Sequence, residues 1–181
     1  MGIATLIKAI DFAARKHRVQ RRKGAAGSPY INHPIAVANI LVEIGEVHDT
    51  TVLTAAILHD TIEDTETTAA ELSHHFGEAV SVLVQEVTDD KSLPKARRKE
   101  LQIQHAPGFS PEATLIKLGD KIHNVGEIAN DPPPDWPLER RLEYLAWADS
   151  VIENAPAANA NLELKFASVL AEARKKVESC S

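Results

Sequence analysis

The stretch LHDTIED, residues 58–64, holds the densest group of chemically reactive side chains in the chain. His59 and Glu63 are four positions apart, and so are Asp60 and Asp64, so on a helix each pair would share one face. Carboxylates this close to one another repel, and a bound cation would turn that repulsion into attraction. The stretch therefore predicts a metal site with two further acids beside it.

Two more candidate ligands lie on other segments of the chain. His33 precedes Pro34, which suits the start of a helix, and Asp120 lies inside a segment with helical apolar spacing. A single histidine at a helix start is more often a cap or a core-edge residue than a ligand. Taken together, His33, His59, Asp60 and Asp120 form a mixed imidazole and carboxylate set that suits an octahedral divalent ion such as Mn²⁺, Fe²⁺ or Zn²⁺.

An ion of this kind lowers the pKa of a bound water and polarises a phosphoryl oxygen. Glu63 and Asp64, one turn beyond the ligand pair, could hold or deprotonate that water, or protonate a leaving group. The basic loop around Arg22 and Lys23 would neutralise phosphate charge, and its alternative interpretation is a solvated basic turn. These residue types together indicate phosphate chemistry.

Composition limits the class of protein. The chain has 181 residues, of which 44 % are apolar and 25 % are charged, as expected for one globular domain spanning residues 1–181. The net charge of −6 argues against a protein that coats nucleic acid. Cys180, the single cysteine, cannot form an internal disulfide, and no apolar run is long enough to cross a bilayer. We expect a cytoplasmic protein without nucleic-acid or membrane partners.

The elements that must position these residues all show helical spacing, and no convincing strand pair is present. Asp49, Thr68 and Ser110 are placed to cap helices, and Gly77 is placed to end one. Helices are expected over residues 3–19, 34–45, 50–60, 68–77, 78–87, from about 94, 111–125, 138–154 and 162–177. The predicted fold class is all-α, a single helical bundle with a central metal site.

Four longer motifs carry a resemblance to a known family. They are RRKGAAGSPYINHP, AAILHDTIEDT, FGEAVSVLVQEVTDDKSLP and LIKLGDKIHN, and they lie in the segment 21–124. The sequence resembles the HD-domain metal phosphohydrolases and, within them, the RelA/SpoT-type alarmone hydrolases in their small stand-alone form, which is also found in animals. An HD pair alone is a weak signal, whereas the four motifs in this order are specific.

The resemblance implies a helical, Mn²⁺-dependent enzyme that removes the 3′-diphosphate of ppGpp or pppGpp, leaving GDP or GTP and pyrophosphate. Carried over, the metal ligands are His33, His59, Asp60 and Asp120, and the catalytic acids are Glu63 and Asp64. The implied substrate-binding residues are Arg22, Lys23, Asn124, Lys95, Arg140 and Tyr144. We expect a monomer or a homodimer, with no room for the synthetase domain of the long members.

The sequence departs from the family pattern at two places. Gly119 stands where related sequences usually have Ala, and Val125-Gly126 stands where they often have a large residue and then Arg. The first change costs about 1 kcal/mol of helix propensity, and the second concerns the nucleotide pocket.

Two other functions remain open at this point. One is an HD phosphohydrolase acting on another nucleotide, such as a 2′-phosphatase of NADPH, and the other is a non-enzymatic nucleotide-sensing helical domain. The four predicted metal ligands and the two predicted catalytic acids are all present in the sequence, which favours an enzyme. Structural roles are open for the other histidines, at positions 17, 48, 74, 75, 105 and 123.

Overall fold

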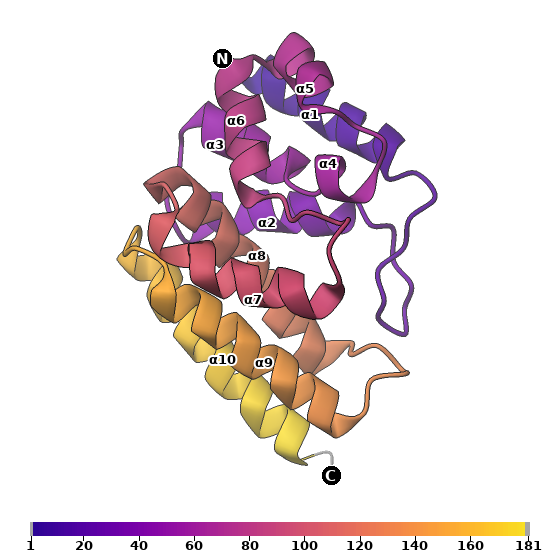
Figure 1. Cartoon of the computed structure of the whole chain (residues 1–181), viewed down its shortest axis with the longest axis vertical. Helices are drawn as coiled ribbons and strands as arrows, with labels where there is room; N and C mark the ends of the chain where they lie inside the picture. Colours follow the sequence, from indigo (N-terminus) through magenta and orange to yellow (C-terminus); the bar gives the residue numbers. More distant parts are fainter. Residues whose placement is uncertain (1, 180–181) are drawn as a thin grey trace.

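The computed structural model describes residues 2–179, and this part of the chain is helical throughout apart from its connections (Figure 1). The helices are α1 (Ile3–Lys16), α2 (Asn32–Glu43), α3 (Thr50–Leu58), α4 (Thr61–Asp64), α5 (Ala69–Phe76), α6 (Glu78–Val87), α7 (Lys95–His105), η1 (Ala106–Gly108), α8 (Pro111–Asn130), α9 (Leu138–Asn154) and α10 (Ala160–Ser179). The predicted all-α class is confirmed, and Cys180 lies outside the described residues.

Two of the predicted caps fix the starts of the helices that carry site residues. The carboxylate of Asp49 accepts the backbone N–H of Thr51 at 2.6 Å and of Val52 at 3.2 Å, and so begins α3. Ser110 Oγ accepts the N–H of Ala113 at 3.1 Å at the start of α8. Each bond satisfies a backbone donor that the first turn of a helix leaves without an internal partner.

Thr68 and Glu71 have the spacing of a capping box at the start of α5, which forms only in part. Thr68 Oγ1 accepts the backbone N–H of Glu71 at 3.2 Å, as expected of the N-cap. The Glu71 carboxylate instead bonds to Lys16 Nζ of α1 at 2.9 Å, so it ties two helices together. Gly77, with φ of +91°, ends α5 as predicted.

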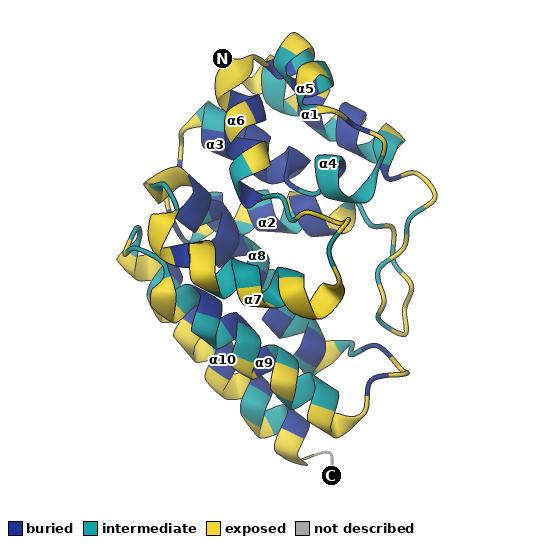
Figure 2. Ribbon diagram, in the orientation of Figure 1, coloured by how far each residue is buried: buried dark blue, intermediate teal, exposed yellow. Residues whose placement is uncertain are grey.

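A largely apolar helix, α3, lies at the centre of the part of the bundle that includes α1, α2 and α6. Every residue from Val52 to Leu58 is buried, and α3 packs against α1, α2 and α6 (Figure 2). A helix without a polar face needs cover all round, which explains this central position. The second long buried element is α8, which packs against α2 and α10. No helix within residues 2–179 has both the length and the apolar character that crossing a bilayer requires.

Gly119 lets α2 and α8 approach closely. A Cβ at this position would lie 3.1 Å from Val37 Cγ1 and 3.2 Å from Leu41 Cδ2, tighter than ordinary contact. These two helices carry His33 and Asp120, so the glycine gives up helix propensity for a close approach of two predicted ligands.

Candidate active site

The His59-Asp60 pair lies at a break between α3 and α4, close to the predicted end of the helix over residues 50–60, so the two four-residue pairs do not share one helix. Thr61 Oγ1 donates to the carbonyl of Leu58 at 2.7 Å, which takes up the last carbonyl of α3. A helical backbone bond of 2.8 Å still joins the Asp64 N–H to the Asp60 carbonyl. The break leaves the two ligand candidates at a corner of the chain rather than along one face.

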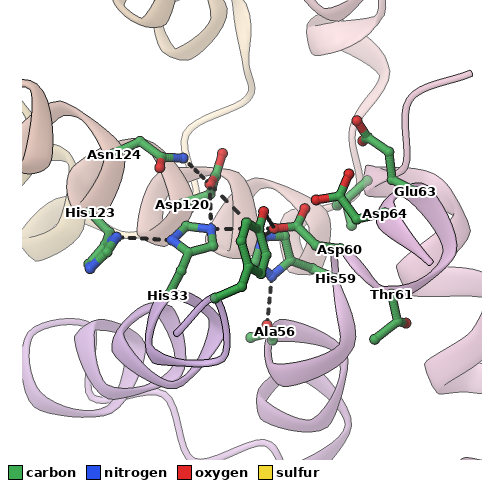
Figure 3. Close-up of polar contacts among 12 residues, drawn as sticks. His33, Ala56, His59, Asp60, Thr61, Glu63, Asp64, Asp120, His123 and Asn124 are labelled. Atoms are coloured by element: carbon green, nitrogen blue, oxygen red, sulfur yellow. Dashed lines mark hydrogen bonds and ion pairs between the residues drawn. The ribbon is translucent and has the colours of Figure 1, made fainter. Parts of the chain in front are cut away.

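All four predicted metal ligands converge (Figure 3). His33 Nε2 lies 3.5 Å from Asp60 Oδ2 and 3.2 Å from Asp120 Oδ1. His59 Nε2 lies 3.1 Å from the same Asp60 oxygen and 3.9 Å from the same Asp120 oxygen. The structure therefore brings together α2, the corner between α3 and α4, and α8 at one point.

The chemistry of these groups fits a divalent cation. His59 Nδ1 lies 2.8 Å from the carbonyl oxygen of Ala56, which can only accept, so Nδ1 carries the proton and Nε2 has the free lone pair. That Nε2 atom is buried and has no hydrogen-bond partner among the described residues. A buried acceptor facing two carboxylates is costly unless a positive group lies between them. Ligand atoms of His33, His59 and Asp60 lie within 4.8 Å of one another, close enough to share one ion.

The electrostatics of the group agree with this fit. Burial opposes the charged form of His59, but Asp60 and Asp120 outweigh it and raise the His59 pKa to about 9. Burial also acts against the Asp120 carboxylate, yet Lys121 and the two histidines hold its pKa well below the usual range. The four side chains thus favour a positive charge at their centre, which a metal ion supplies in place of the proton.

Glu63 lies beside the ligands and has an unusual pKa. Its Oε1 accepts from Arg98 Nη1 at 3.2 Å, and its Oε2 accepts from the backbone N–H of Asp89 at 3.2 Å. Burial, followed by the neighbouring carboxylates of Asp89 and Asp60, raises the Glu63 pKa to about 7. A carboxyl with this pKa can take up or release a proton near neutral pH.

Asp64 is held by two partners that sequence reasoning did not connect to it. Gln20 Nε2 donates to Asp64 Oδ2 at 2.8 Å, and Lys91 Nζ is paired with the other carboxylate oxygen. Gln20 in turn contacts His17 Nδ1 at 2.7 Å through its own Oε1. These residues lie far from Asp64 in the sequence, and no spacing rule could have linked them.

Arg22 lies at the site but is not a free phosphate clamp. Its Nε donates to Glu127 Oε2 at 2.9 Å, its Nη2 pairs closely with the same carboxylate, and Nη2 also donates to Asn124 Oδ1 at 2.5 Å. Asn124 Nδ2 then donates to Asp120 Oδ1 at 2.5 Å. The Arg22 charge is thus already matched, and the residue orients Asn124 against a predicted ligand.

The other predicted cations gather away from the ligands. A cavity of about 520 Å³ is lined by the predicted ligands and by Lys23 and Lys95, and Arg140 packs on Trp136, a further lining residue, with its guanidinium carbon 4.3 Å from the ring centre. Burial, followed by the positive charges of Arg140, Lys23 and Arg98, lowers the Lys95 pKa. Arg22 is paired with a carboxylate, whereas these cations repel one another. A bound anion would reduce that repulsion.

Three aromatic rings form a wall of the same cavity, and two of them were missed in the sequence. Tyr144 was predicted; Trp136 and Trp147 lie on either side of it, with ring centres 5.7 Å and 5.3 Å away. Lys121 Nζ lies 4.3 Å from the centre of the Trp147 ring and donates to Asp120 Oδ2 at 3.0 Å. The spacing of three between Tyr144 and Trp147 on α9 was the available signal.

Lys117, Asp120 and Asn124 are spaced three and four apart on α8, a spacing that indicates one polar stripe, but only two of them interact. Asn124 and Asp120 interact as their spacing indicates, but the buried Lys117 turns away and donates to the carbonyl of Val87 at 2.7 Å. This bond gives a partner to a carbonyl at the C-terminal end of α6, where the carbonyls without helical partners favour a cation. Lys117 therefore links α8 to the C-terminal end of α6, two residues before Asp89.

Comparison with known proteins now adds to this geometry. The HD domain family matches residues 9–144 of the chain. The chain belongs to the HD domain family. The corner with the His59-Asp60 pair lies within the matched range, as do the other two predicted metal ligands.

Individual relatives narrow the family further. The HD domain protein is 52 % identical over 160 residues to guanosine-3′,5′-bis(diphosphate) 3′-pyrophosphohydrolase MESH1 of Homo sapiens, covering 88 % of this chain and 89 % of the relative. The Drosophila melanogaster MESH1 is 46 % identical over 163 residues, covering 90 % of this chain and 91 % of the relative.

A solved structure agrees with these relatives. It is that of a metazoan orthologue of SpoT that hydrolyses ppGpp, and it matches with a TM-score of 0.92 and 44 % identity, covering 95 % of this chain and 97 % of the other. This HD domain protein is thus a member of the RelA/SpoT-type hydrolases, a branch of the metal-dependent phosphohydrolases.

Proposed function

We propose that the protein hydrolyses ppGpp and pppGpp at the 3′-diphosphate, giving GDP or GTP and pyrophosphate. The observation that carries this proposal is one cavity lined both by a group of side chains that fits a cation and by Lys23 and Lys95, whose positive charges lie close to each other and to Arg140. A nucleotide with phosphates on both sides of its ribose has this charge pattern. The activities named for MESH1 and for the metazoan SpoT orthologue support the same substrate.

His33, His59, Asp60 and Asp120 would hold the metal, for which we propose Mn²⁺. When bound, the ion would polarise a phosphoryl oxygen and lower the pKa of a water. The chain's own contribution is the orientation of the ligands: a backbone carbonyl fixes the His59 ring, and Asn124 and Lys121 fix the Asp120 carboxylate. Such supporting bonds hold ligands in place and tune their basicity.

Glu63 and Asp64 would manage the protons of the reaction. Glu63, with a pKa of about 7, takes a proton from the attacking water, whose oxygen forms a bond to the phosphorus next to the ribose. Asp64, held by Gln20 and Lys91, accepts a hydrogen bond from the same water and orients it. The bond between that phosphorus and the ribose O3′ breaks, and Glu63 returns the proton to O3′.

Recognition of the nucleotide would rest on the far end of the cavity. Lys23 and Lys95 can reach phosphate oxygens, and Arg140, which packs on Trp136, adds positive charge. Tyr144 offers a ring face on which a base can stack. Arg22 and Asn124 would contact the substrate at the ribose, between the ligands and these cations.

The test is release of pyrophosphate from ppGpp by purified protein, with and without Mn²⁺. Asp64→Ala should abolish turnover, because the attacking water loses its oriented acceptor. Asp135→Ala is the matched control, since Asp135 is an exposed aspartate on the loop after α8. Its activity should equal that of the wild type. NADPH is assayed in parallel for release of orthophosphate.

Manganese-dependent formation of GDP that is lost in Asp64→Ala and kept in Asp135→Ala would support the proposal. Absence of ppGpp turnover by metal-loaded protein would refute the alarmone assignment. Orthophosphate released from NADPH under the same conditions would then favour the 2′-phosphatase. Binding of ppGpp without turnover of either nucleotide would favour a sensor.

A further inference from the structure

The His33 ring makes a second contact that its predicted role does not explain. Its Nδ1 atom, on the side away from the carboxylates, lies 2.9 Å from Nδ1 of His123 on α8 (Figure 3). The His33 side chain is only 1 % exposed, so water does not replace this partner easily. Two nitrogens at this distance form a hydrogen bond only when one of them carries a proton.

The surroundings decide which nitrogen carries it. His33 Nε2 faces Asp60 and Asp120 and must offer a lone pair if it binds a cation, so the proton of neutral His33 belongs on Nδ1. His123 Nδ1 is then the acceptor, and the proton of its own neutral ring belongs on Nε2. That Nε2 lies 4.0 Å from Glu127 Oε1, a carboxylate that favours an N–H on this side. Both assignments agree with each other.

We propose that His123 is a positioning residue that holds the metal ligand His33 as its Nδ1–H tautomer, with Nε2 directed at the cation. The proposal rests on the proposed metal site and adds a residue to it. His123 touches neither substrate nor metal in this arrangement, and it acts only through His33.

The two imidazole ligands are supported in different ways. The His59 N–H bonds to the backbone carbonyl of Ala56, which no side-chain change can remove. His33 depends on a side chain, so its orientation is the one that a substitution can alter. Polar contacts also lead from His123 back to the other side of the site and close a ring. In order, its members are His33, His123, Glu127, Arg22, Asn124 and Asp120.

A packing role for His123 is the competing explanation, and substitution separates the two. The rings of His33 and His123 have centres 4.9 Å apart, and a phenyl ring could preserve that contact. His123→Phe therefore keeps the packing and removes the acceptor. His123→Asn can place its amide oxygen near the position of Nδ1 and so restore an acceptor with a smaller side chain. His105→Phe, on the exposed end of α7, controls for the chemical change.

The primary measurement is the affinity of metal-stripped protein for Mn²⁺, from electron paramagnetic resonance of the free ion. His123→Phe should weaken binding about 10- to 100-fold, the usual effect of removing the partner of a ligating histidine. His123→Asn should recover most of that loss, and His105→Phe should match the wild type. The second measurement is nitrogen-15 NMR of the histidine rings with Zn²⁺ bound, in which His33 should show a protonated Nδ1.

Wild-type affinity in His123→Phe, or binding by His123→Asn as weak as in His123→Phe, would overturn the proposal. So would an NMR spectrum with the His33 proton on Nε2, and this measurement on the wild type decides the matter if a variant does not fold. The proposed function is tested separately. Loss of Mn²⁺ affinity in His123→Phe together with no ppGpp turnover by the wild type would keep the role of His123 and refute the substrate.

Discussion

The raised pKa of Glu63 predicts that this carboxyl destabilises the metal-free protein at neutral pH. Its folded-state pKa is about 7, against an ordinary value of 4.5. Below pH 4.5 the group is protonated in both states and contributes nothing. Between pH 4.5 and 7 the folded state binds the proton more tightly, so the free energy of unfolding falls as the pH rises. Above pH 7 the carboxyl is ionised in both states, and the free energy of unfolding has lost the full contribution.

The size of the effect follows from the same two values. Each pH unit between them corresponds to about 1.4 kcal/mol, which gives about 3 kcal/mol for a fully buried group. The Glu63 side chain is 18 % exposed, so solvent screening reduces this to about 2 to 3 kcal/mol. Glu63→Gln has the same size and cannot ionise. It should be about 2 to 3 kcal/mol more stable than the wild type at pH 8 and similar to it at pH 4.5.

Urea unfolding of chelator-treated protein from pH 4.5 to 8 measures this difference. The matched control is Glu100→Gln on the exposed face of α7. Its free energy of unfolding should differ from that of the wild type by a small amount, without the increase between pH 4.5 and 8 that is expected for Glu63→Gln. Saturating Mn²⁺ should remove the advantage of Glu63→Gln, because a nearby cation favours the ionised carboxylate. A Glu63→Gln variant that is less stable than the wild type at pH 8, or equally stable at all pH values, would refute the reasoning.

Two further substitutions test the packing around the site. Glu127→Ala should lower the free energy of unfolding by about 1 to 3 kcal/mol in urea, because the Arg22 side chain, 13 % exposed, would lose its carboxylate partner; unchanged stability would show that this pair does not hold Arg22. Gly45→Ala should cost about 1 to 3 kcal/mol in the same assay, since its Cβ would lie 2.8 Å from the Leu41 carbonyl oxygen. A more stable Gly45→Ala would contradict this.

Much of the helical order was predictable because its signals are local. The start of α3 at Asp49, the start of α8 after Ser110 and the end of α5 at Gly77 each follow from the capping chemistry of one residue. The end of α3 near the His59-Asp60 pair was expected as well, but the contact that produces it was not predictable in this way. It depends on a hydroxyl of Thr61 competing for a backbone carbonyl, and helical spacing continues across it.

The site was predictable in its reactive residues and not in their supports. His33, His59, Asp60 and Asp120 could be selected because few residue types bind metals. The partners that fix them are ordinary amides, rings and cations, such as Gln20 for Asp64 and His123 for His33. Their function comes from contact between distant segments, which residue type and spacing do not encode. For the same reason the pairing of Arg22 with Glu127 was missed.

The ligands and the far wall of the cavity belong to different parts of the bundle. The four ligand side chains come from α2, the corner after α3, and α8, whereas Tyr144 and Trp147 come from α9. A mutation on α9 can therefore change the shape offered to a base or sugar without replacing a predicted ligand. Because Lys121 contacts the Trp147 ring and donates to the Asp120 carboxylate, a change at Trp147 would also reach the predicted metal site through that lysine.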